Sequence, residues 1–590
     1  MRRRTTVFAL AVALMALAAV AVPGAASLND STATEAGGVT DSVVADNHIE
    51  ECAAEPPADY ADPDGGNEVL GWVDGIWYNE PLAIDTSDGL NDTELEHLSA
   101  RTTARVEAIR CLAAVDGTPP VQIQTREEFQ ANQTGTYANV SEKNRLADNA
   151  RFETTLMISS EEDSISVREA NRGTTVGGFY SPTENRIVVV TDDPENFLIE
   201  EQVLAQEVGH AIQDQQFNLT RLVGETTDED LGYEGLVEGD MNLVDQRYQQ
   251  ACNEGLWNEP CVSESNENGG GSGSGPANWG LYLQSFQPYS EGPPFIQSIY
   301  EAEGWDAIDA MYDNPPDSAL YTVFPETYEE VDLADVEVAD QSSDGWERLT
   351  WEDELDYDTL GPSNIAAMFM ATTYDSQQPI IDPQSFLNTT AGGEVSNTQP
   401  LIYGHPQTEG WRDDKLYTYQ NGNQTGTVWK VEWASAEDAK PFIESYGQLA
   451  GIRGGEAVDG YEHTYRFGEN SDWDMALTLV PDGSTVTVVT APTVEDLTAV
   501  HDIDLVESQE STPTATPTET STATPTETST DSSESGDDTA EPTPTETPMS
   551  EDTPTATETP EDSDGDGAGF GVLAGVLAVT MTALIVRRRR

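Results

Sequence analysis

The amino-acid sequence predicts an α+β fold between residues 67 and 506. Two segments, 176–191 and 416–433, each hold two extended apolar runs around a short turn signal, which is typical of β-hairpins. Other segments, such as 91–113 and 203–217, space their apolar residues at helical intervals. Strands and helices therefore both contribute to the ordered part of the chain, whereas the two ends follow other patterns.

The N-terminal residues predict an export signal and a polar leader. Arginines at 2–4 precede an apolar run at 7–22 and small residues at 24–26, which is the pattern of a secretory signal peptide. We assign the signal to 1–26, and the choice between the Sec and twin-arginine routes stays open. Residues 27–66 are polar, acidic and without apolar periodicity, so we expect a flexible leader.

The C-terminal residues predict a stalk and a membrane anchor. Residues 507–566 consist of Thr, Pro, Glu and Ser repeats, which cannot bury a core and favour an extended, O-glycosylated stalk. Residues 568–586 are apolar and span about 28 Å as a helix, enough for a hydrocarbon core of about 30 Å. The arginines at 587–590 are expected in the cytoplasm, which places the bulk of the chain on the extracellular face of the membrane.

The charge of the chain indicates a halophilic protein and excludes one class of partner. The formal net charge is -82, from 108 acidic and 26 basic residues. Such charge makes a fold repel itself unless salt screens it, and the Debye length at 1 M salt is only about 3 Å. No basic patch is available to meet phosphates, so nucleic acid is excluded as a partner.

The four cysteines favour two disulfides over a metal site, because the chain is exported and no C-x-x-C spacing occurs. We favour Cys52 with Cys111 and Cys252 with Cys261, although the sequence alone leaves three connectivities open. Seven N-glycosylation sequons agree with an exported glycoprotein. They lie at Asn29, Asn91, Asn132, Asn139, Asn218, Asn388 and Asn423.

The first half of the ordered part begins with a helix at 91–113 behind an Asn cap, followed by a strand at 121–124. Thr125 and Glu128 form a capping box that starts the next helix. After the hairpin at 176–191, the acids and proline at 193–195 are expected to open the central helix.

Further helices are expected at 234–252, 295–312, 361–373 and 435–449, with a flexible Gly/Ser loop at 263–276. The acidic stretch at 328–358 shows no clear pattern.

Hairpins at 416–433 and 475–490 complete a small α+β part near the C-terminal end. We therefore divide the ordered residues into 67–330 and 331–506.

The central helix carries most of a metallopeptidase motif. In His-Glu-x-x-His, two imidazoles one turn apart bind zinc and the glutamate between them acts as general base. The corresponding residues here are Gln206, Glu207, Val208, Gly209 and His210. The glutamate and the second histidine are present, and a glutamine replaces the first histidine.

Several longer stretches resemble large exported surface proteins of halophilic archaea that contain a zincin-like helix. The matching stretches begin at Gly71, Val176, Val203, Gly235, Asn314 and Gly410, and together they cover most of 67–506. The C-terminal tail resembles an archaeal sorting signal, whose cleavage is followed by lipid anchoring. In place of the Pro-Gly-Phe of such signals, this chain has Ala568-Gly569-Phe570, so a plain transmembrane anchor is the alternative.

The resemblance implies a zincin-like core of the gluzincin type. It maps the general base to Glu207, one ligand to His210 and a further ligand to Glu238 on the following helix, with Asp240 as the alternative. The degenerate position is Gln206, whose amide oxygen is a poorer zinc ligand than imidazole. We expect no zinc, or weakly bound zinc, unless another histidine completes the site, for which His405 is the best candidate.

We therefore expect a membrane-anchored cell-surface glycoprotein whose zincin-like ectodomain has lost peptidase activity. An active zinc metallopeptidase is the first alternative. A structural or adhesive protein of the cell envelope is the second, with other envelope components as its partners. No nucleophile elbow, P-loop or dinucleotide-binding motif suggests another enzyme class.

Overall fold

The computed structural model describes residues 14–15, 52–133, 140–191, 193–194, 197–263, 275–352, 354–390, 392–468 and 471–507. These residues form helices and two substantial sheets, which confirms the α+β class. The predicted stalk beyond 507, the membrane span and the terminal arginines lie outside the described residues, as does all of the predicted signal peptide except 14–15. Within the described part of the chain, no helix is long and apolar enough to cross a membrane.

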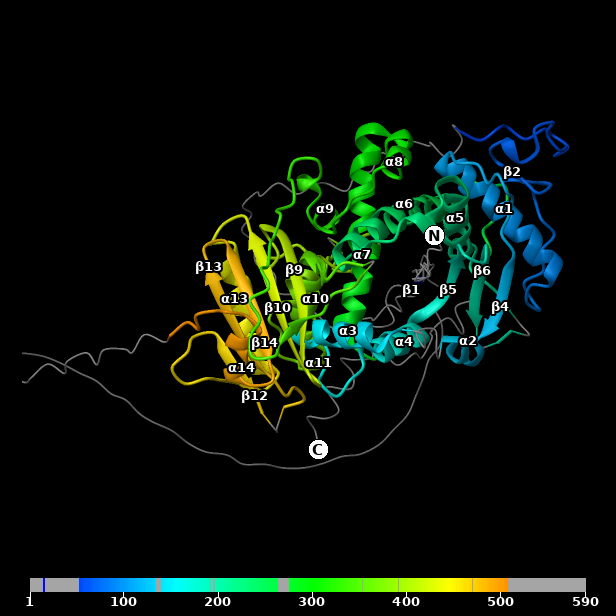
Figure 1. Cartoon of the computed structure of the whole chain (residues 1–590). Coiled ribbons are helices and arrows are strands. Elements are labelled where there is room, and N and C mark those ends of the chain that lie inside the picture. The colour runs from blue at the N-terminus through cyan, green and yellow to red at the C-terminus, as the bar shows by residue number, and fades with distance from the viewer. Residues whose placement is uncertain are drawn as a thin grey trace, which may run out of the picture. The chain divides into compact units, whose positions relative to one another are not determined.

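The first sheet contains the predicted hairpin. Strand β5 (Val176–Ser181) pairs antiparallel with β6 (Arg186–Thr191), and β6 pairs in parallel with β4 (Val121–Thr125). A two-residue strand, β1 (Leu14–Met15), pairs with the other edge of β5. In Figure 1 this sheet lies beside helices α5 and α1.

Helix α1 (Asp92–Arg110) crosses the helix that carries the motif, α5 (Glu201–Phe217), and confirms the expected helix at 91–113. Asn91 caps α1 by accepting from the backbone N–H groups of Thr93 and Glu94, which completes a capping box. Apolar side chains of both helices pack with those of β5 and β6 into one core. The sheet and α1 thus hold α5 from two sides.

The start of α5 differs from the prediction. The helix begins at Glu201 rather than at 193–195, because its N-cap Glu200 is extended and 197–199 belong to no helix. Phe197 and Ile199 are buried there, and the carbonyl of Phe197 accepts from the N–H of Leu90 at 2.8 Å. Long-range contacts therefore outweigh the local helix-start signal.

Helix α6 (Thr227–Glu254) follows α5 and packs against a long helix, α7 (Trp279–Glu303). Both differ from the expected bounds, since α6 begins seven residues before 234 and α7 begins well before 295. Helix α7 ends at Gly304, whose φ of 78° breaks the expected helix at 295–312, and α8 (Trp305–Met311) continues beyond it.

Glycines let α6 and α7 approach closely. A Cβ on Gly239 would lie 2.5 Å from the carbonyl oxygen of Gly292, and a Cβ on Gly292 would lie 2.5 Å from that of Gly235. No side chain other than hydrogen fits at this crossing. The close approach brings residues of α7 against the face of α6 that carries Glu238.

The second sheet has the strand order β11-β12-β13-β14-β10-β9-β7, with β8 also paired to β9. Its central hairpins confirm two predictions: β9 (Trp411–Asn421) with β10 (Gln424–Trp433), and β13 (Ala476–Asp482) with β14 (Thr485–Ala491). Helix α13 (Ala439–Ile452) packs on one face. The acidic stretch at 328–358 supplies Val336, Val338 and Trp346 to a core on the other.

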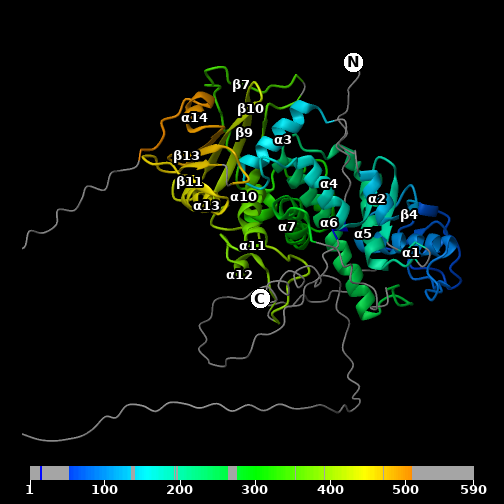
Figure 2. The same ribbon diagram turned by 90° about the horizontal axis from the view of Figure 1, so that it is seen from below.

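The two sheets belong to one compact unit, and the largest core contains residues from both sides of the expected boundary at 330. Helix α3 (Glu142–Thr154) lies against β9 and β10, as the view in Figure 2 shows. Oγ1 of Thr154 lies 2.7 Å from Oγ1 of Thr427 on β10. Helix α7 packs on α10 (Gly361–Met370), where Gln284 donates to Asn364 at 2.8 Å.

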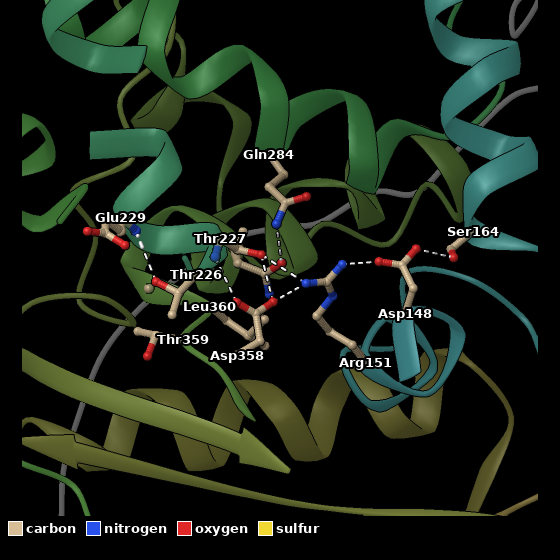
Figure 3. Close-up of polar contacts among 12 residues, drawn as sticks. Asp148, Arg151, Ser164, Thr226, Thr227, Glu229, Gln284, Asp358, Thr359 and Leu360 are labelled. Carbon is tan, nitrogen blue, oxygen red and sulfur yellow. Dashed lines mark hydrogen bonds and ion pairs between the residues drawn. The ribbon is translucent and has the colours of Figure 1, made fainter. Parts of the chain in front are cut away.

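A charged junction joins three segments in Figure 3. Arg151 of α3 forms ion pairs with Asp148 on its own helix and with Asp358 of β8 (Tyr357–Asp358). Asp358 in turn accepts from the backbone N–H of Thr227 at 2.7 Å, at the first turn of α6. The N-terminus of the helix that carries Glu238 is therefore anchored to both neighbouring segments.

The remaining elements are short or peripheral. They are β2 (Trp72–Val73), β3 (Ile76–Trp77), α2 (Arg126–Gln133), α4 (Ser164–Thr175), α9 (Leu320–Val323), β7 (Glu347–Arg348), α11 (Thr372–Asp375), α12 (Pro383–Phe386), β11 (Gly455–Ala457), β12 (Thr464–Phe467) and α14 (Val494–Val500), with one-turn 3₁₀ helices at Gly66–Glu68, Leu219–Arg221 and Pro325–Thr327.

Both favoured disulfides are present: Cys52 with Cys111 at a Cα–Cα distance of 5.3 Å, and Cys252 with Cys261 at 5.6 Å. The first ties the leader to the end of α1, and the second closes the segment after α6.

Candidate functional site

The motif residues lie on the buried face of α5. The exposed fractions of Gln206, Glu207 and His210 are 7%, 1% and 0%. This face is turned toward β5 on one side and α6 on the other. The polar side chains of the motif therefore sit in the protein interior rather than on the surface of α5.

Helix α6 brings Glu238 to the motif. Oε2 of Glu238 lies 3.5 Å from Nε2 of His210, and the Glu238 side chain is 4% exposed. The fold thus brings together two residues that are 28 positions apart in the sequence.

The polar atoms of this group have few partners. Both carboxylate oxygens of Glu207, Nε2 of His210 and Oε2 of Glu238 are buried without a hydrogen bond of normal geometry. Burial raises the pKa of Glu207 to about 8, against a smaller opposing effect of the charge on His210. Burial lowers the pKa of His210, but the carboxylates of Glu238 and Glu207 outweigh it, and the net shift is upward.

Two further acidic groups adjoin Glu238. Tyr289 of α7 is hydrogen-bonded to Glu238, and burial raises the pKa of its hydroxyl well above 10. Burial together with the charges of Asp230 and Glu238 raises the pKa of Glu234 well above its usual value. Tyr289 is not predicted from the sequence, because the only signal for it is the glycine spacing that brings α7 onto α6.

Asp240, the alternative ligand, has another role. Its carboxylate accepts from Nε of Arg110 at 2.7 Å and from Nη2 at 3.2 Å, in an ion pair whose side chains are at most 1% exposed. A second acid, Asp309, also contacts Arg110 at 2.6 Å. Because Asp240 is engaged in this pair, Glu238 is the better candidate ligand.

His405 does not complete the group. It is buried in the loop before β9, where its backbone N–H donates to Oγ1 of Thr408 at 3.0 Å. In the described residues, no group of three or more His, Cys, Asp or Glu side chains is placed to hold a metal ion. Among the described histidines, none therefore replaces the ligand lost at Gln206.

The donor set fits zinc in two positions and not in the third. Two donors that each lie about 2.0–2.1 Å from a tetrahedral Zn²⁺ are about 3.4 Å apart, close to the 3.5 Å between His210 and Glu238. A catalytic zinc needs three protein ligands, and the third position here offers the neutral amide of Gln206. The residues present thus do not fit a catalytic zinc site.

The sequons occupy varied positions. Asn91, Asn218 and Asn423 are exposed and Asn388 is half-buried, whereas Asn29 and Asn139 lie outside the described residues, as does the side chain of Asn132. Nδ2 of Asn91 donates to Glu94 at 2.6 Å while its oxygen caps α1. Glycosylation of this amide nitrogen would therefore compete with the helix cap.

Comparison with known proteins gives one match. The model of a domain of unknown function, DUF8575, matches residues 347–501, which include the second sheet from β7 to β14. No curated protein and no solved structure matches the chain.

Proposed function

We propose that this chain is an exported, membrane-anchored cell-surface glycoprotein whose zincin-like ectodomain does not hydrolyse peptides. The signal at 1–26 and the span at 568–586 support export and anchoring. The two disulfides agree with an oxidising compartment outside the cytoplasm. The chain is anchored in the membrane by its C-terminal helix, or by a lipid if the tail is processed.

The loss of peptidase activity rests on one observation, the glutamine at position 206. His210 and Glu238 stand at the spacing of two zinc ligands, with Glu207 buried beside them. The zincin-like assignment draws further support from the hairpin β5–β6, which precedes α5 and packs against it. Without a third strong ligand, Glu207 has no activated water to deprotonate.

The test is zinc content and peptide hydrolysis of the exported protein, purified in high salt. We expect zinc well below one ion per chain and no cleavage of casein or of a mixed peptide library. The variant Gln206→His should gain zinc, because it restores the first histidine of the motif as the third protein ligand. Gln216→His, the same change on the exposed end of α5, serves as the control and should gain none.

A working metallopeptidase is the competing function, and the 3.5 Å spacing of His210 and Glu238 is the observation that favours it. Stoichiometric zinc in the wild-type chain, lost in His210→Ala together with peptide cleavage, would establish it and overturn our proposal. If neither the wild-type chain nor Gln206→His binds zinc, the structural or adhesive envelope role replaces both.

Anchoring has a separate test. Deletion of 568–590 should release the protein into the medium, whereas the full chain should stay with the membrane fraction. Release of both forms would contradict the anchor.

A further inference from the structure

His210 stands at the end of a chain of buried hydrogen bonds that begins on another helix. Nδ1 of His210 lies 2.8 Å from Oε1 of Gln213, one turn later on α5. Nε2 of Gln213 reaches Oδ2 of Asp240 at 3.1 Å, and Asp240 is held by Arg110 of α1. His210, Gln213 and Asp240 have no exposed surface, and Arg110 has 1%.

The partners of Gln213 fix the orientation of its amide. Nε2 also points at the carbonyl oxygen of Val237, at 3.1 Å, and at the hydroxyl of Tyr312, at 2.6 Å. A carbonyl and a carboxylate paired with arginine only accept hydrogen bonds, so the amide nitrogen of Gln213 must face them. Its oxygen is therefore the atom that faces His210.

An amide oxygen only accepts, so Nδ1 of His210 must carry a proton. When His210 is charged, Nε2 carries a second proton that faces Oε2 of Glu238 at 3.5 Å; in the neutral ring, the lone pair is then on Nε2. We propose that Gln213 is a positioning residue that holds His210 in its Nδ1–H form, with Nε2 directed at Glu238. Asp240 and Arg110 act behind it by preventing a flip of the Gln213 amide.

The arrangement has a chemical consequence for the pocket. A neutral imidazole held by Nδ1 presents Nε2 as a ligand for a divalent cation, and residues that fix this orientation tune metal affinity in proteins. The pocket thus keeps His210 oriented as a ligand although Gln206 has replaced the first histidine. This inference goes beyond the proposed function, since it concerns Gln213 whether or not the chain binds zinc.

The first experiment is nitrogen NMR of the full chain labelled with ¹⁵N-histidine, in molar salt. The chain has six histidines, and the His210→Asn variant identifies the signals of His210. We expect Nδ1 of His210 to remain of the protonated, pyrrole type across the pH titration. A pyridine-type Nδ1 at any pH would overturn the proposal.

Variants of Gln213 supply the second readout. Gln213→Leu removes the acceptor, so His210 should change to the Nε2–H form, which donates to Glu238, and Nδ1 should become pyridine-type at the alkaline end of the titration. Gln213→Glu, protonated beside Asp240, keeps an oxygen at Nδ1 and should preserve the wild-type pattern. Gln216→Leu, the same truncation on the exposed end of α5, is the matched control.

A pyrrole-type Nδ1 retained in Gln213→Leu would refute the role of Gln213. If that variant does not fold, a pyridine-type Nδ1 in the wild-type or the Gln213→Glu spectrum still refutes the proposal.

A zinc titration is an independent test of the proposal. In the Gln206→His background, adding Gln213→Leu should weaken zinc binding by about 10–100-fold, and adding Gln216→Leu should leave it unchanged. Equal affinity in the two double variants would contradict the proposal. If Gln206→His binds no zinc at all, the zincin-like assignment fails, while the NMR result for Gln213 stands on its own.

Discussion

At the scale of single residues, the candidate site depends on which buried charges are paired. Arg110 contacts two acids, the fully buried Asp240 and the partly exposed Asp309. Burial would lower the pKa of Arg110, but the charges of Asp240 and Asp309 outweigh it and keep the side chain charged. The two acids offer a matched comparison within one ion-pair group.

Asp240→Asn should destabilise the fold by roughly 3–5 kcal/mol, because removing one partner of a buried ion pair leaves the other charge uncompensated. Asp309→Asn, whose side chain is 34% exposed, should cost less than about 1 kcal/mol. Urea unfolding in molar salt measures both. Equal costs for the two variants would show that Arg110 draws no special stabilisation from Asp240.

At the scale of secondary-structure elements, local signals predicted elements well. The predicted Asn cap at Asn91 and the predicted capping box of Thr125 with Glu128 are both present, and Glu94 extends the Asn91 cap to a box. Capping depends on residues three apart, so the sequence contains all the information needed.

Boundaries that depend on tertiary contacts were predicted less well. Helix α7 runs from Trp279 through Pro288, Pro293 and Pro294, although proline disfavours helix interiors. Its burial between α6 and α10 outweighs that local preference. The sequence was equally uninformative about two features of the site: the contact of Tyr289 with Glu238 and the ion pair of Asp240 with Arg110. Both depend on how α1, α6 and α7 pack together.

The crossing of α6 and α7 gives an element-scale prediction. Gly239→Ala places a methyl group 2.5 Å from the carbonyl oxygen of Gly292, so it should cost about 1–3 kcal/mol by forcing the helices apart. Gly451→Ala on α13 meets no atom within 4 Å and should stabilise by about 0.4–1 kcal/mol. Thermal unfolding in molar salt compares them. A neutral Gly239→Ala would show that the crossing tolerates a wider separation.

At the scale of the whole molecule, the segment matched by DUF8575 shares its core with the preceding residues. Phe152, Leu156 and Leu281 pack in the same cluster as Trp429 and Phe442. The family match therefore marks a recurring sequence segment and not a separate hydrophobic core.

Residues 347–501 expressed alone should accordingly fail to fold. Without α3 and α7, part of one face of the second sheet and of the buried helix α10 would be exposed to water. We expect no cooperative urea transition and strong binding of a hydrophobic dye, whereas 52–507 should unfold cooperatively. A cooperative transition of the isolated segment would contradict the shared core.

The pH dependence of stability is also a property of the whole molecule, because several carboxyl groups are buried without a cation. Burial raises the pKa of Glu107 to about 8, although it accepts from the N–H groups of Gly71 and Ala114. Burial raises the pKa of Glu291 to about 8 as well. In the unfolded chain both groups return to values near 4.5.

Between about pH 4.5 and 8 the folded state therefore binds more protons at these groups than the unfolded state, so stability falls as pH rises. The contribution is fully present below the unfolded pKa and is lost as pH passes the folded one. We expect a higher melting temperature at the acidic end of this window, measured in molar salt so that repulsion among surface acids is screened. Glu107→Gln should lower stability at acidic pH, since its amide nitrogen would face a backbone N–H, and should flatten the dependence. A melting temperature that rises steadily toward pH 8 would show that these carboxyl groups are not buried as described.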